Sequence, residues 1–507
     1  MRDKNFAPPT RSTKIKSIVS LIVTIVLVVG AILFYKFILP SFGKKTRFDV
    51  RYDASTQTYT ISGVYFYQKG TLEIPSEYSD DANGTHPVTA IVGGVRDFAN
   101  GDGQIESLII PDSVTSIGDG VFANCSSLKN VSIGNGVTYF GDDVFKGCDN
   151  LEYNRYDNGF YLGNDENPYL IFMQAKDKGI ESCKINDKAR FVNSKAFEGC
   201  SVLASVDIPD GVTGIGRSAF SNCGLIKSVS LPNVTRIGDS AFSGCGLESV
   251  TLGKNLKTIG NFAKHSKLRT IRFGGDVSEW FAVEGLYNLT QASEAYTLYL
   301  QNEKAYSVEI PEGITEIPYC AFCGCVNITS VTIPESVTEI GAYAFKNCPK
   351  LIEIVNKGSL DLKEELGYEF IENINVAKDG KSRIERLGDF VFYNDRLLEY
   401  VGSDISITLP DSYKGCDYDV YEYAFSDCYD ATEIIVSEGA FQIRVNAFRY
   451  CDNLERISLP FVGGSRNETY NNQKVFGYIF GYEVSGSRTD RDDAVLQYSD
   501  RSGGEDR

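Results

Sequence analysis

Cysteine is the residue type in this sequence with the widest chemical scope, because thiolates bind metals, form disulfides and attack electrophiles. The chain of 507 residues contains 13 cysteines but only two histidines. Nine of the cysteines each stand three residues after a phenylalanine, and consecutive members are mostly 22 or 23 residues apart. They are Cys125, Cys148, Cys200, Cys223, Cys245, Cys325, Cys348, Cys428 and Cys451. This regularity indicates a repeated structural position.

We expect these nine cysteines to form a ladder of buried thiols, called here the cysteine ladder. Cysteine is small and readily buried, and neighbouring strands of a stacked repeat lie ~4.8 Å apart. Side chains that project in parallel at this spacing do not match disulfide geometry. The phenylalanines that precede the cysteines share a second repeat position, and they are Phe122, Phe145, Phe197, Phe220, Phe242, Phe322, Phe345, Phe425 and Phe448.

Two further cysteines stand beside a ladder member in the sequence Cys320-x-x-Cys323-x-Cys325. A metal site typically needs four ligands, and this stretch has neither a histidine nor a fourth cysteine close by in sequence. Free thiols at Cys320 and Cys323 are therefore favoured over a local disulfide, and a metal site is the weakest of the three alternatives. No metal or other cofactor is expected.

The two histidines are expected to be structural. His86 lies in a Gly-Thr-His-Pro turn, and His265 occupies a position where the repeat pattern places a cysteine. A general base would need partners that orient it, and the sequence has no Gly-x-Ser-x-Gly elbow, phosphate-binding loop or His-Glu-x-x-His motif. These observations predict that the protein is not an enzyme.

Charge is distributed unevenly along the chain. Lysine and arginine total 50 against 67 aspartates and glutamates, a net charge of −17. Residues 1–47 contain nine basic residues and one acid, so the remainder carries about −25. An acidic body of this kind repels phosphate backbones, and nucleic-acid binding is therefore excluded as an expected function.

The stretch 325–348 shows the element that must position the cysteines. Val331 and Ile333 alternate with polar residues as in a short strand, and Pro334 follows. Gly341 permits a turn before the next phenylalanine and cysteine. No segment of this length can bury its own apolar face, so the pattern requires that copies stack on one another. The sequence predicts a β-rich solenoid of stacked repeats, with a short strand and a turn or short helical segment in each repeat of ~23 residues.

The N-terminal region is predicted to anchor the protein in a membrane. Residues 1–17 form a basic tail, and residues 18–39 contain only Lys36 as a charged residue, enough for one helix across a bilayer. The competing interpretation is a cleaved signal peptide, but the apolar run is longer than is usual and no small-residue cleavage pattern follows it. Five basic residues precede the uncharged run, and five follow it closely when Lys36 is counted among them, so the charge count does not determine the orientation.

The remaining boundaries follow from where the repeat pattern begins, breaks and ends. A segment with two aromatic runs around a Gly-Asn-Asp-Glu-Asn-Pro turn, within 158–172, predicts a β-hairpin. The expected organisation is a juxtamembrane linker at 40–57, an N-terminal cap at 58–104, the solenoid at 105–460 with insertions at 152–176, 274–301 and 356–403, and a C-terminal segment at 461–507.

Several copies resemble one known repeat family. The sequences SLIIPDSVTSIGDGVFANC, SVDIPDGVTGIGRSAFSNC and SVTIPESVTEIGAYAFKNC are similar to the BspA-type leucine-rich repeat of bacterial surface proteins in register, spacing and the ending Ala-Phe-x-x-Cys. The resemblance covers about 105–460 apart from the insertions. It implies a curved β-rich solenoid displayed outside the cell and, in some members, binding to host matrix proteins or other bacteria.

The function expected from these observations is binding of a protein or glycan ligand outside the cell, by a single-pass protein held in the membrane through its N-terminal helix. Protruding aromatic residues often anchor interfaces, and those of the insertions are candidates for the binding surface, although packing within the array is the alternative for each. They are Tyr161, Tyr169, Trp280 and Tyr393. The alternative function is a structural spacer without a specific ligand, reaching on the order of 60 Å for about a dozen coils at ~4.8 Å each.

Overall fold

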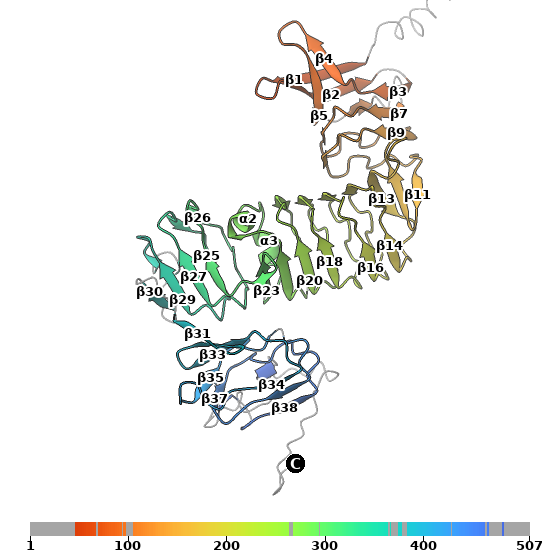
Figure 1. Cartoon of the computed structure of the whole chain (residues 1–507). Coiled ribbons are helices and arrows are strands. Elements are labelled where there is room, and N and C mark those ends of the chain that lie inside the picture. Colours follow the sequence, from red (N-terminus) through yellow and green to blue (C-terminus); the bar gives the residue numbers. More distant parts are fainter. Residues whose placement is uncertain are drawn as a thin grey trace, which may run out of the picture. The chain divides into compact units, whose positions relative to one another are not determined.

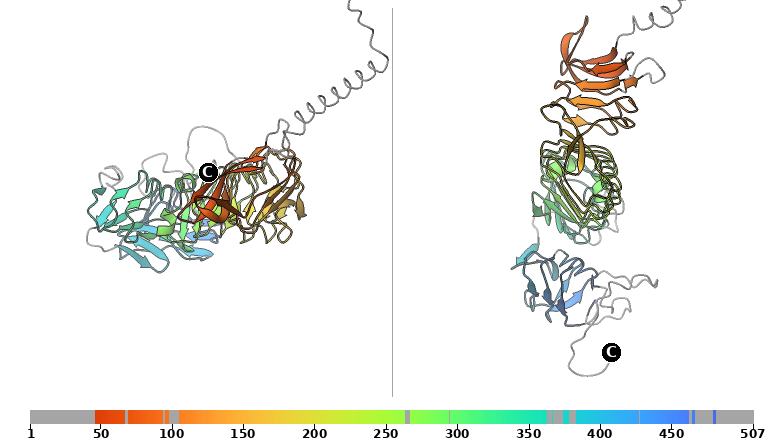
Figure 2. Two further views of the ribbon diagram at one scale, coloured as in Figure 1. Left: turned by 90° about the horizontal axis from the view of Figure 1, so that it is seen from above. Right: turned by 90° about the vertical axis from the view of Figure 1, so that its right-hand side faces the viewer.

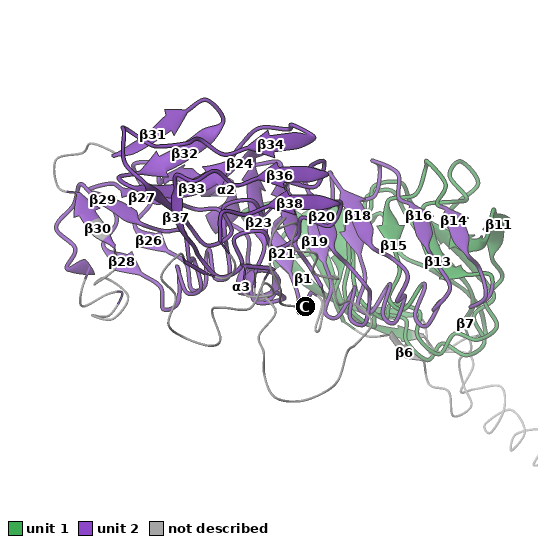
Figure 3. Ribbon diagram, turned by 90° about the horizontal axis from the view of Figure 1, so that it is seen from below, with its two compact units in different colours: residues 1–176, 185–196 green, residues 177–184, 197–507 purple. Residues whose placement is uncertain are grey.

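Successive copies of the repeat each form one coil of a solenoid (Figure 1). The computed structural model describes residues 46–461 except 67–68, 94, 98–104, 263–266, 294, 363–365, 367–373, 378–382 and 427, and in addition 464–465 and 479–480. The chain divides into two compact units, the first of residues 1–176 and 185–196 and the second of residues 177–184 and 197–507 (Figure 3). Each unit is described by itself.

The expected basic tail at 1–17 and membrane span at 18–39 lie outside the described residues, as do His265 and most of the C-terminal segment 461–507. Within the described part of the chain, no helix has the length and apolar character needed to cross a bilayer.

Unit 1 begins with a sheet that includes part of the expected linker. β1 (Arg47–Asp53) pairs antiparallel with β2 (Thr58–Phe66), and β2 pairs parallel with β5 (Gly84–Ile91). A linker was therefore the wrong assignment for residues 47–53. The physical reason is an alternation of apolar and charged residues in Arg-Phe-Asp-Val-Arg-Tyr-Asp, which packs Phe48, Val50 and Tyr52 against the core. The remaining strands of this region are β3 (Gly70–Glu73), β4 (Glu77–Asp80) and β6 (Val95–Asp97).

The coils of unit 1 build two parallel rows of strands. β3 pairs with β7 (Ile105–Ile110), which pairs with β9 (Asn130–Ile133), and the second row continues from β5 through β8 (Ser116–Ile117) to β10 (Tyr139–Phe140). A three-stranded antiparallel meander follows, made of β11 (Asn154–Tyr156), β12 (Gly159–Leu162) and β13 (Ile171–Ala175). It confirms the hairpin predicted within 158–172. β13 then pairs parallel with β15 (Phe191–Val192), so the meander is part of a coil.

Unit 2 repeats the two-row arrangement with greater regularity. In β18 (Ser228–Leu231), for example, exposed serines alternate with buried Val229 and Leu231, which places one face of the strand in the core. Seen along its coils in the right-hand view of Figure 2, the part near residues 200–300 shows coils that superpose. The first row contains β14 (Ser182–Lys184) with β16 (Ser205–Asp207), then β18 (Ser228–Leu231), β20 (Ser249–Leu252), β22 (Thr270–Phe273), β23 (Thr297–Leu300) and β24 (Glu303–Lys304). The second row contains β17 (Gly214–Ile215), β19 (Arg236–Ile237) and β21 (Thr258–Ile259).

The expected insertion at 274–301 is an enlarged coil. It holds two short helices, α2 (Val277–Phe281) and α3 (Tyr287–Thr290), and returns to the sheet through β23, which pairs in parallel register with β22. Asp276 starts α2 by a capping box, in which its carboxylate accepts from the backbone N–H of Glu279 and the Glu279 carboxylate accepts from that of Asp276. Between the helices, Glu284 forms a single parallel bridge with Thr258 of β21 (Thr258–Ile259), where other coils have a two-residue second-row strand.

The rest of unit 2 resumes the coils and then changes to a second antiparallel meander. The coils contain β25 (Ser307–Glu309), β27 (Ser330–Ile333), β29 (Glu353–Asn356) and β30 (Asn375–Ala377) in one row, with β26 (Glu316–Ile317) and β28 (Glu339–Ile340) in the other. The second meander contains β31 (Ile384–Leu387), β32 (Phe390–Tyr393) and β33 (Arg396–Tyr400), and it leads to parallel β35 (Tyr418–Val420) and β37 (Ala440–Ile443), beside β34 (Ser406–Thr408), β36 (Glu433–Ile435) and β38 (Arg456–Ser458).

The phenylalanine and cysteine positions form two columns along the coils. Phe197, Phe220 and Phe242 stack with ring centroids 4.9 and 5.1 Å apart and nearly parallel planes. Within the ladder, a cysteine thiol donates to the carbonyl oxygen of the phenylalanine one coil earlier, as Cys223 Sγ does to Phe197 O at 3.1 Å. Four further ladder cysteines make the same contact at 3.0 to 3.2 Å, and they are Cys148, Cys245, Cys348 and Cys451. Cysteine suits this position because it combines a small apolar side chain with one weak donor.

Candidate functional site

Three of the four aromatic residues expected at the binding surface are buried. The Trp280 side chain is 0% exposed, and its Nε1 donates to the carbonyl oxygen of Ala321 at 3.0 Å. Tyr161 is likewise 0% exposed and makes edge-to-face contacts with three aromatic rings. Tyr393 is buried beside Ile352. The expectation of a binding surface at these three positions is therefore corrected: each ring fills space between coils or strands.

Tyr169, the fourth candidate, is half-buried. Its ring lies 5.5 Å from that of Tyr161 and 5.7 Å from that of Tyr156, both in the first meander. It belongs to an aromatic cluster that stabilises the meander.

Exposed aromatic residues occur at positions other than the four candidates, although one of them, Tyr287, lies in the insertion 274–301. Tyr287, Tyr319 and Tyr343 form a row across neighbouring coils, called here the tyrosine row, with ring centroids 5.8 and 6.0 Å apart in edge-to-face geometry. Their exposed fractions are 46%, 44% and 57%. Tyr319 and Tyr343 each follow a two-residue strand, β26 and β28, in the turn that leads to the phenylalanine column.

The turn geometry explains why the rings of Tyr319 and Tyr343 lie side by side. In each coil the residue five positions before the ladder cysteine adopts a positive φ, 60° at Tyr343 and 54° at Cys320. The chain also comes close to its neighbour here: a Cβ on Gly341 would lie 2.4 Å from the backbone nitrogen of Tyr319. The turns of the two coils are therefore stacked directly, which sets Tyr319 beside Tyr343.

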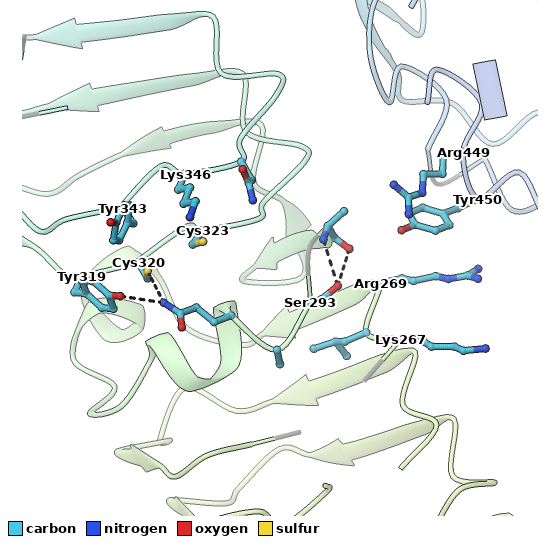
Figure 4. A pocket seen from close by; sticks show the side chains of 15 residues that line it. Lys267, Arg269, Ser293, Tyr319, Cys320, Cys323, Tyr343, Lys346, Arg449 and Tyr450 are labelled. Atoms are coloured by element: carbon cyan, nitrogen blue, oxygen red, sulfur yellow. Dashed lines mark hydrogen bonds between the residues drawn. The ribbon is translucent and has the colours of Figure 1, made fainter. Parts of the chain in front are cut away.

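Two residues of the tyrosine row line a cleft of about 790 Å³ in unit 2 (Figure 4). We call it the tyrosine–cation cleft. Of the described residues that line it, four are basic and none is acidic, although acids outnumber bases in the chain. Its lining residues are Lys267, Leu268, Arg269, Gln291, Ala292, Ser293, Ala295, Tyr319, Cys320, Cys323, Tyr343, Lys346, Asn347, Arg449 and Tyr450.

The cations of the cleft lie against aromatic rings. The guanidinium of Arg269 is 4.6 Å from the ring centroid of Tyr450, and that of Arg449 is 4.9 Å from the same ring. The ammonium of Lys346 is 4.8 Å from the Tyr343 ring. Such contacts contribute ~0.5–1 kcal/mol at exposed sites and hold the charges near the ring faces. A cation stacked on a ring still presents its N–H donors at its edge.

Arg269 also forms an ion pair. Its Nη1 donates to Oδ2 of Asp452 at 2.6 Å, and the Asp452 side chain is 58% exposed. A guanidinium has five N–H donors, so one bond to Asp452 leaves donors for a second anion. The remaining polar groups are neutral: Gln291 Nε2 donates to the Tyr319 hydroxyl at 3.3 Å and to Cys320 Sγ at 2.9 Å.

The Cys320 and Cys323 thiols lie in this cleft, and neither forms a disulfide. Burial raises the pKa of the Cys323 thiol to about 11, so the group stays protonated at neutral pH. A protonated thiol is a poor nucleophile and a poor metal ligand. Among the described residues, no three His, Cys, Asp or Glu side chains are grouped as metal ligands.

His86 lies in unit 1, where its Nε2 is 3.0 Å from the carbonyl oxygen of Asn83 and 3.4 Å from the Tyr52 hydroxyl. It joins a strand to a neighbouring turn.

The sequence contained one signal for the cleft. Tyrosine stands in the turn before the phenylalanine in both Pro-Tyr-Cys-Ala-Phe and Gly-Ala-Tyr-Ala-Phe. The cations come from coils up to about 180 residues apart, as the pair Arg269–Asp452 shows. No local pattern indicates that these side chains meet.

Comparison with known proteins agrees with the repeat. A family model described as "BspA type Leucine rich repeat region" matches in six copies, over residues 94–164, 172–281, 295–418 and 405–476. No curated protein matches the chain in a search by sequence.

Solved structures with similarity include a leucine rich cell surface protein from Faecalibacterium prausnitzii, 23% identical, covering 86% of this chain and 98% of that chain with a TM-score of 0.25. A leucine-rich repeat protein from Bacteroides ovatus is 19% identical and covers 82% and 94%, with a TM-score of 0.24. The pneumococcal vaccine antigen PcpA is 13% identical and covers 82% and 98%, with a TM-score of 0.23. Because the family model matches more than half of the chain, this protein belongs to the BspA type leucine-rich repeat family.

Proposed function

We propose that this protein is a cell-surface binding protein that engages its ligand at the tyrosine–cation cleft. The observation that carries the proposal is the cleft itself, where exposed tyrosines and four cations converge on a chain of net charge −17, with no carboxylate among the described lining residues. Tyrosine and arginine are enriched among residues that dominate binding energy. Surface proteins with this repeat are generally concerned with binding or adhesion, which supports the same conclusion.

The proposal includes display outside the cell, with residues 18–39 as a membrane anchor. Protease treatment of intact cells, followed by detection of the solenoid, tests this part. Digestion on intact cells is expected. Protection on intact cells with digestion after lysis would mean that the solenoid faces the cytoplasm.

Binding is tested with the purified full-length protein in detergent micelles, against a panel of matrix proteins, mucin and glycans. The double variant Tyr319→Ala/Tyr343→Ala should lower affinity for a ligand of the cleft at least about tenfold, because each ring is a large contact surface. Tyr139→Ala is the matched control, since Tyr139 is an exposed tyrosine of unit 1 outside the cleft. An equal loss of affinity in Tyr139→Ala would contradict a ligand site at the cleft. So would saturable binding whose affinity is the same in the double variant as in the natural protein.

The alternative is a structural spacer without a ligand. It is favoured by the regular coils of unit 2, in which β18, β20, β22 and β23 pair in parallel without interruption. A spacer predicts no saturable binding to any member of the panel. Saturable binding that depends on Tyr319 and Tyr343 would reject it.

A further inference from the structure

We propose that the ligand of the tyrosine–cation cleft is an acidic oligosaccharide, whose sugar rings pack on the tyrosines and whose carboxylates or sulfates bind the cations. This inference rests on the proposed function and names the chemical class that the cleft selects.

The charge of the cleft is the first step. The part of the lining that the structure describes contains four basic side chains and no acidic one, and the basic residues are Lys267, Arg269, Lys346 and Arg449. The chain as a whole has 17 more acids than bases. A local reversal of this kind attracts an anion and disfavours a cationic partner. Arginine binds carboxylate and sulfate groups through paired N–H donors, which gives directed recognition.

The ring surfaces are the second step. Tyr319 and Tyr343 are 44% and 57% exposed, and their edge-to-face arrangement leaves ring surface open to the cleft. A sugar ring presents aliphatic C–H groups on its faces, which carry partial positive charge and suit the electron-rich face of an aromatic ring. Its hydroxyls require hydrogen-bond partners, and Gln291, Ser293 and Asn347 line the same space.

The arrangement of these groups fits one short ligand. Figure 4 shows Tyr319, Tyr343 and Lys346 on one side of the cleft, with Arg269, Arg449 and Tyr450 on the other. The volume of about 790 Å³ lies within the ~300–1,000 Å³ typical of ligand sites. A ligand that lies between the two sides contacts tyrosine rings on one side and guanidinium groups on the other.

The other anionic ligands fit less well. A single-stranded nucleic acid also combines stacking with charge, but its continuous phosphates would extend past four cations onto an acidic surface. An acidic peptide would need either an open strand edge or deep apolar pockets for its side chains. The lining has no strand edge of this kind, and its aliphatic members are only Leu268, Ala292 and Ala295. A short glycan with few or widely spaced charges avoids both difficulties.

The test titrates full-length protein with matched glycan pairs by calorimetry. The pairs are sialyllactose and lactose, a uronic acid disaccharide and its carboxyl-reduced form, and a sulfated disaccharide and its desulfated form. At least one acidic member should bind about tenfold or more tightly than its neutral partner. Comparison between the pairs distinguishes carboxylate from sulfate as the source of the charge.

Variants test whether the positive charges of the cleft determine the affinity for acidic glycans. Arg269→Gln/Arg449→Gln should weaken the acidic glycan about tenfold or more and leave the neutral one within about twofold. Lys254→Gln/Lys257→Gln is the matched control, because it removes the same charge from exposed positions of unit 2 outside the cleft. Asp452→Asn should strengthen binding of the acidic glycan about twofold to fivefold, since it releases a donor of Arg269. If the ion pair only stabilises the fold, Asp452→Asn should instead weaken binding of the acidic glycan.

The outcomes distinguish this inference from the proposed function. Binding that requires Tyr319 and Tyr343 but is equal for acidic and neutral glycans would overturn the acidic ligand and leave the binding function standing. Tighter binding of a single-stranded oligonucleotide or an acidic peptide to the same arginines would also overturn it. If no ligand depends on the two tyrosines, both proposals are wrong.

Discussion

At the scale of single residues, the cysteine ladder is a packing device. Each thiol that reaches back one coil bonds the carbonyl oxygen of a phenylalanine, which also accepts from the backbone N–H of the cysteine in its own coil. A position that must be small, apolar and a weak donor at once is filled by cysteine. The recurrence of cysteine therefore reflects core geometry and carries no reactive chemistry.

This account predicts the number of free thiols. All 13 cysteines are reduced, and only Cys416 is exposed. A thiol reagent should react rapidly with one group in the native protein and with thirteen after denaturation without reductant. Six or fewer free thiols in the denatured protein would contradict the ladder.

A stability change at high pH is also expected at this scale. Burial raises the pKa of the Cys325 thiol from an ordinary value of 9.0 to about 12. The unfolded state therefore loses the proton first, so the thiol's contribution to stability is complete below pH 9 and is lost as pH rises toward 12. Unfolding by urea at a series of pH values should show this decline. Cys325→Val should make the decline of the free energy of unfolding with pH less steep, whereas Cys416→Val should leave this decline unchanged.

At the scale of elements, a buried ion pair joins the second meander to the preceding coils. Glu399 of β33 accepts from Lys350 Nζ at 3.0 Å and from Lys304 Nζ at 3.5 Å, and the Lys350 and Glu399 side chains are 0% and 2% exposed. A buried pair is costly to break, because removal of one partner leaves the other charge without compensation.

Removal of one member should be strongly destabilising. Glu399→Gln is expected to lower the free energy of unfolding by about 3–5 kcal/mol, whereas Lys350→Met/Glu399→Leu should lower it by less, because it removes both fully buried charges and leaves only the partly exposed Lys304. Urea unfolding of both variants measures the difference. A single variant as stable as the double variant would contradict the assignment of this pair as buried.

The elements also show how far sequence reasoning reaches. The strand and turn of each repeat, and the hairpin within 158–172, could be predicted because their patterns are local. β1 has the alternation typical of a strand, but it directly follows the basic stretch after the predicted membrane span, which favours a linker. The enlarged coil at 274–301 lost the repeat pattern, although β23 returns to the sheet in register. The cleft lies outside local prediction, because Arg269, Tyr343 and Tyr450 meet only through the fold.

At the scale of the whole molecule, the position of the ligand site determines which coils can be deleted without loss of binding. Deletion of residues 201–245 removes two coils and no lining residue of the cleft. Solenoid coils contact mainly their neighbours, so we expect the shortened protein to fold and to bind the ligand of the cleft with affinity within about threefold. Loss of binding in a variant that still unfolds cooperatively would place the ligand site on the deleted coils.

The central claim, that the tyrosine–cation cleft binds the ligand, is tested most directly by a comparison of two full-length proteins on one array of matrix proteins and glycans. The proteins are the natural sequence and Tyr319→Ala/Tyr343→Ala, with unfolding curves to show that both are folded. The account predicts that the natural protein binds a defined subset of the array and that the variant loses this subset while any background is unchanged. The same pattern of bound ligands for both proteins would contradict it.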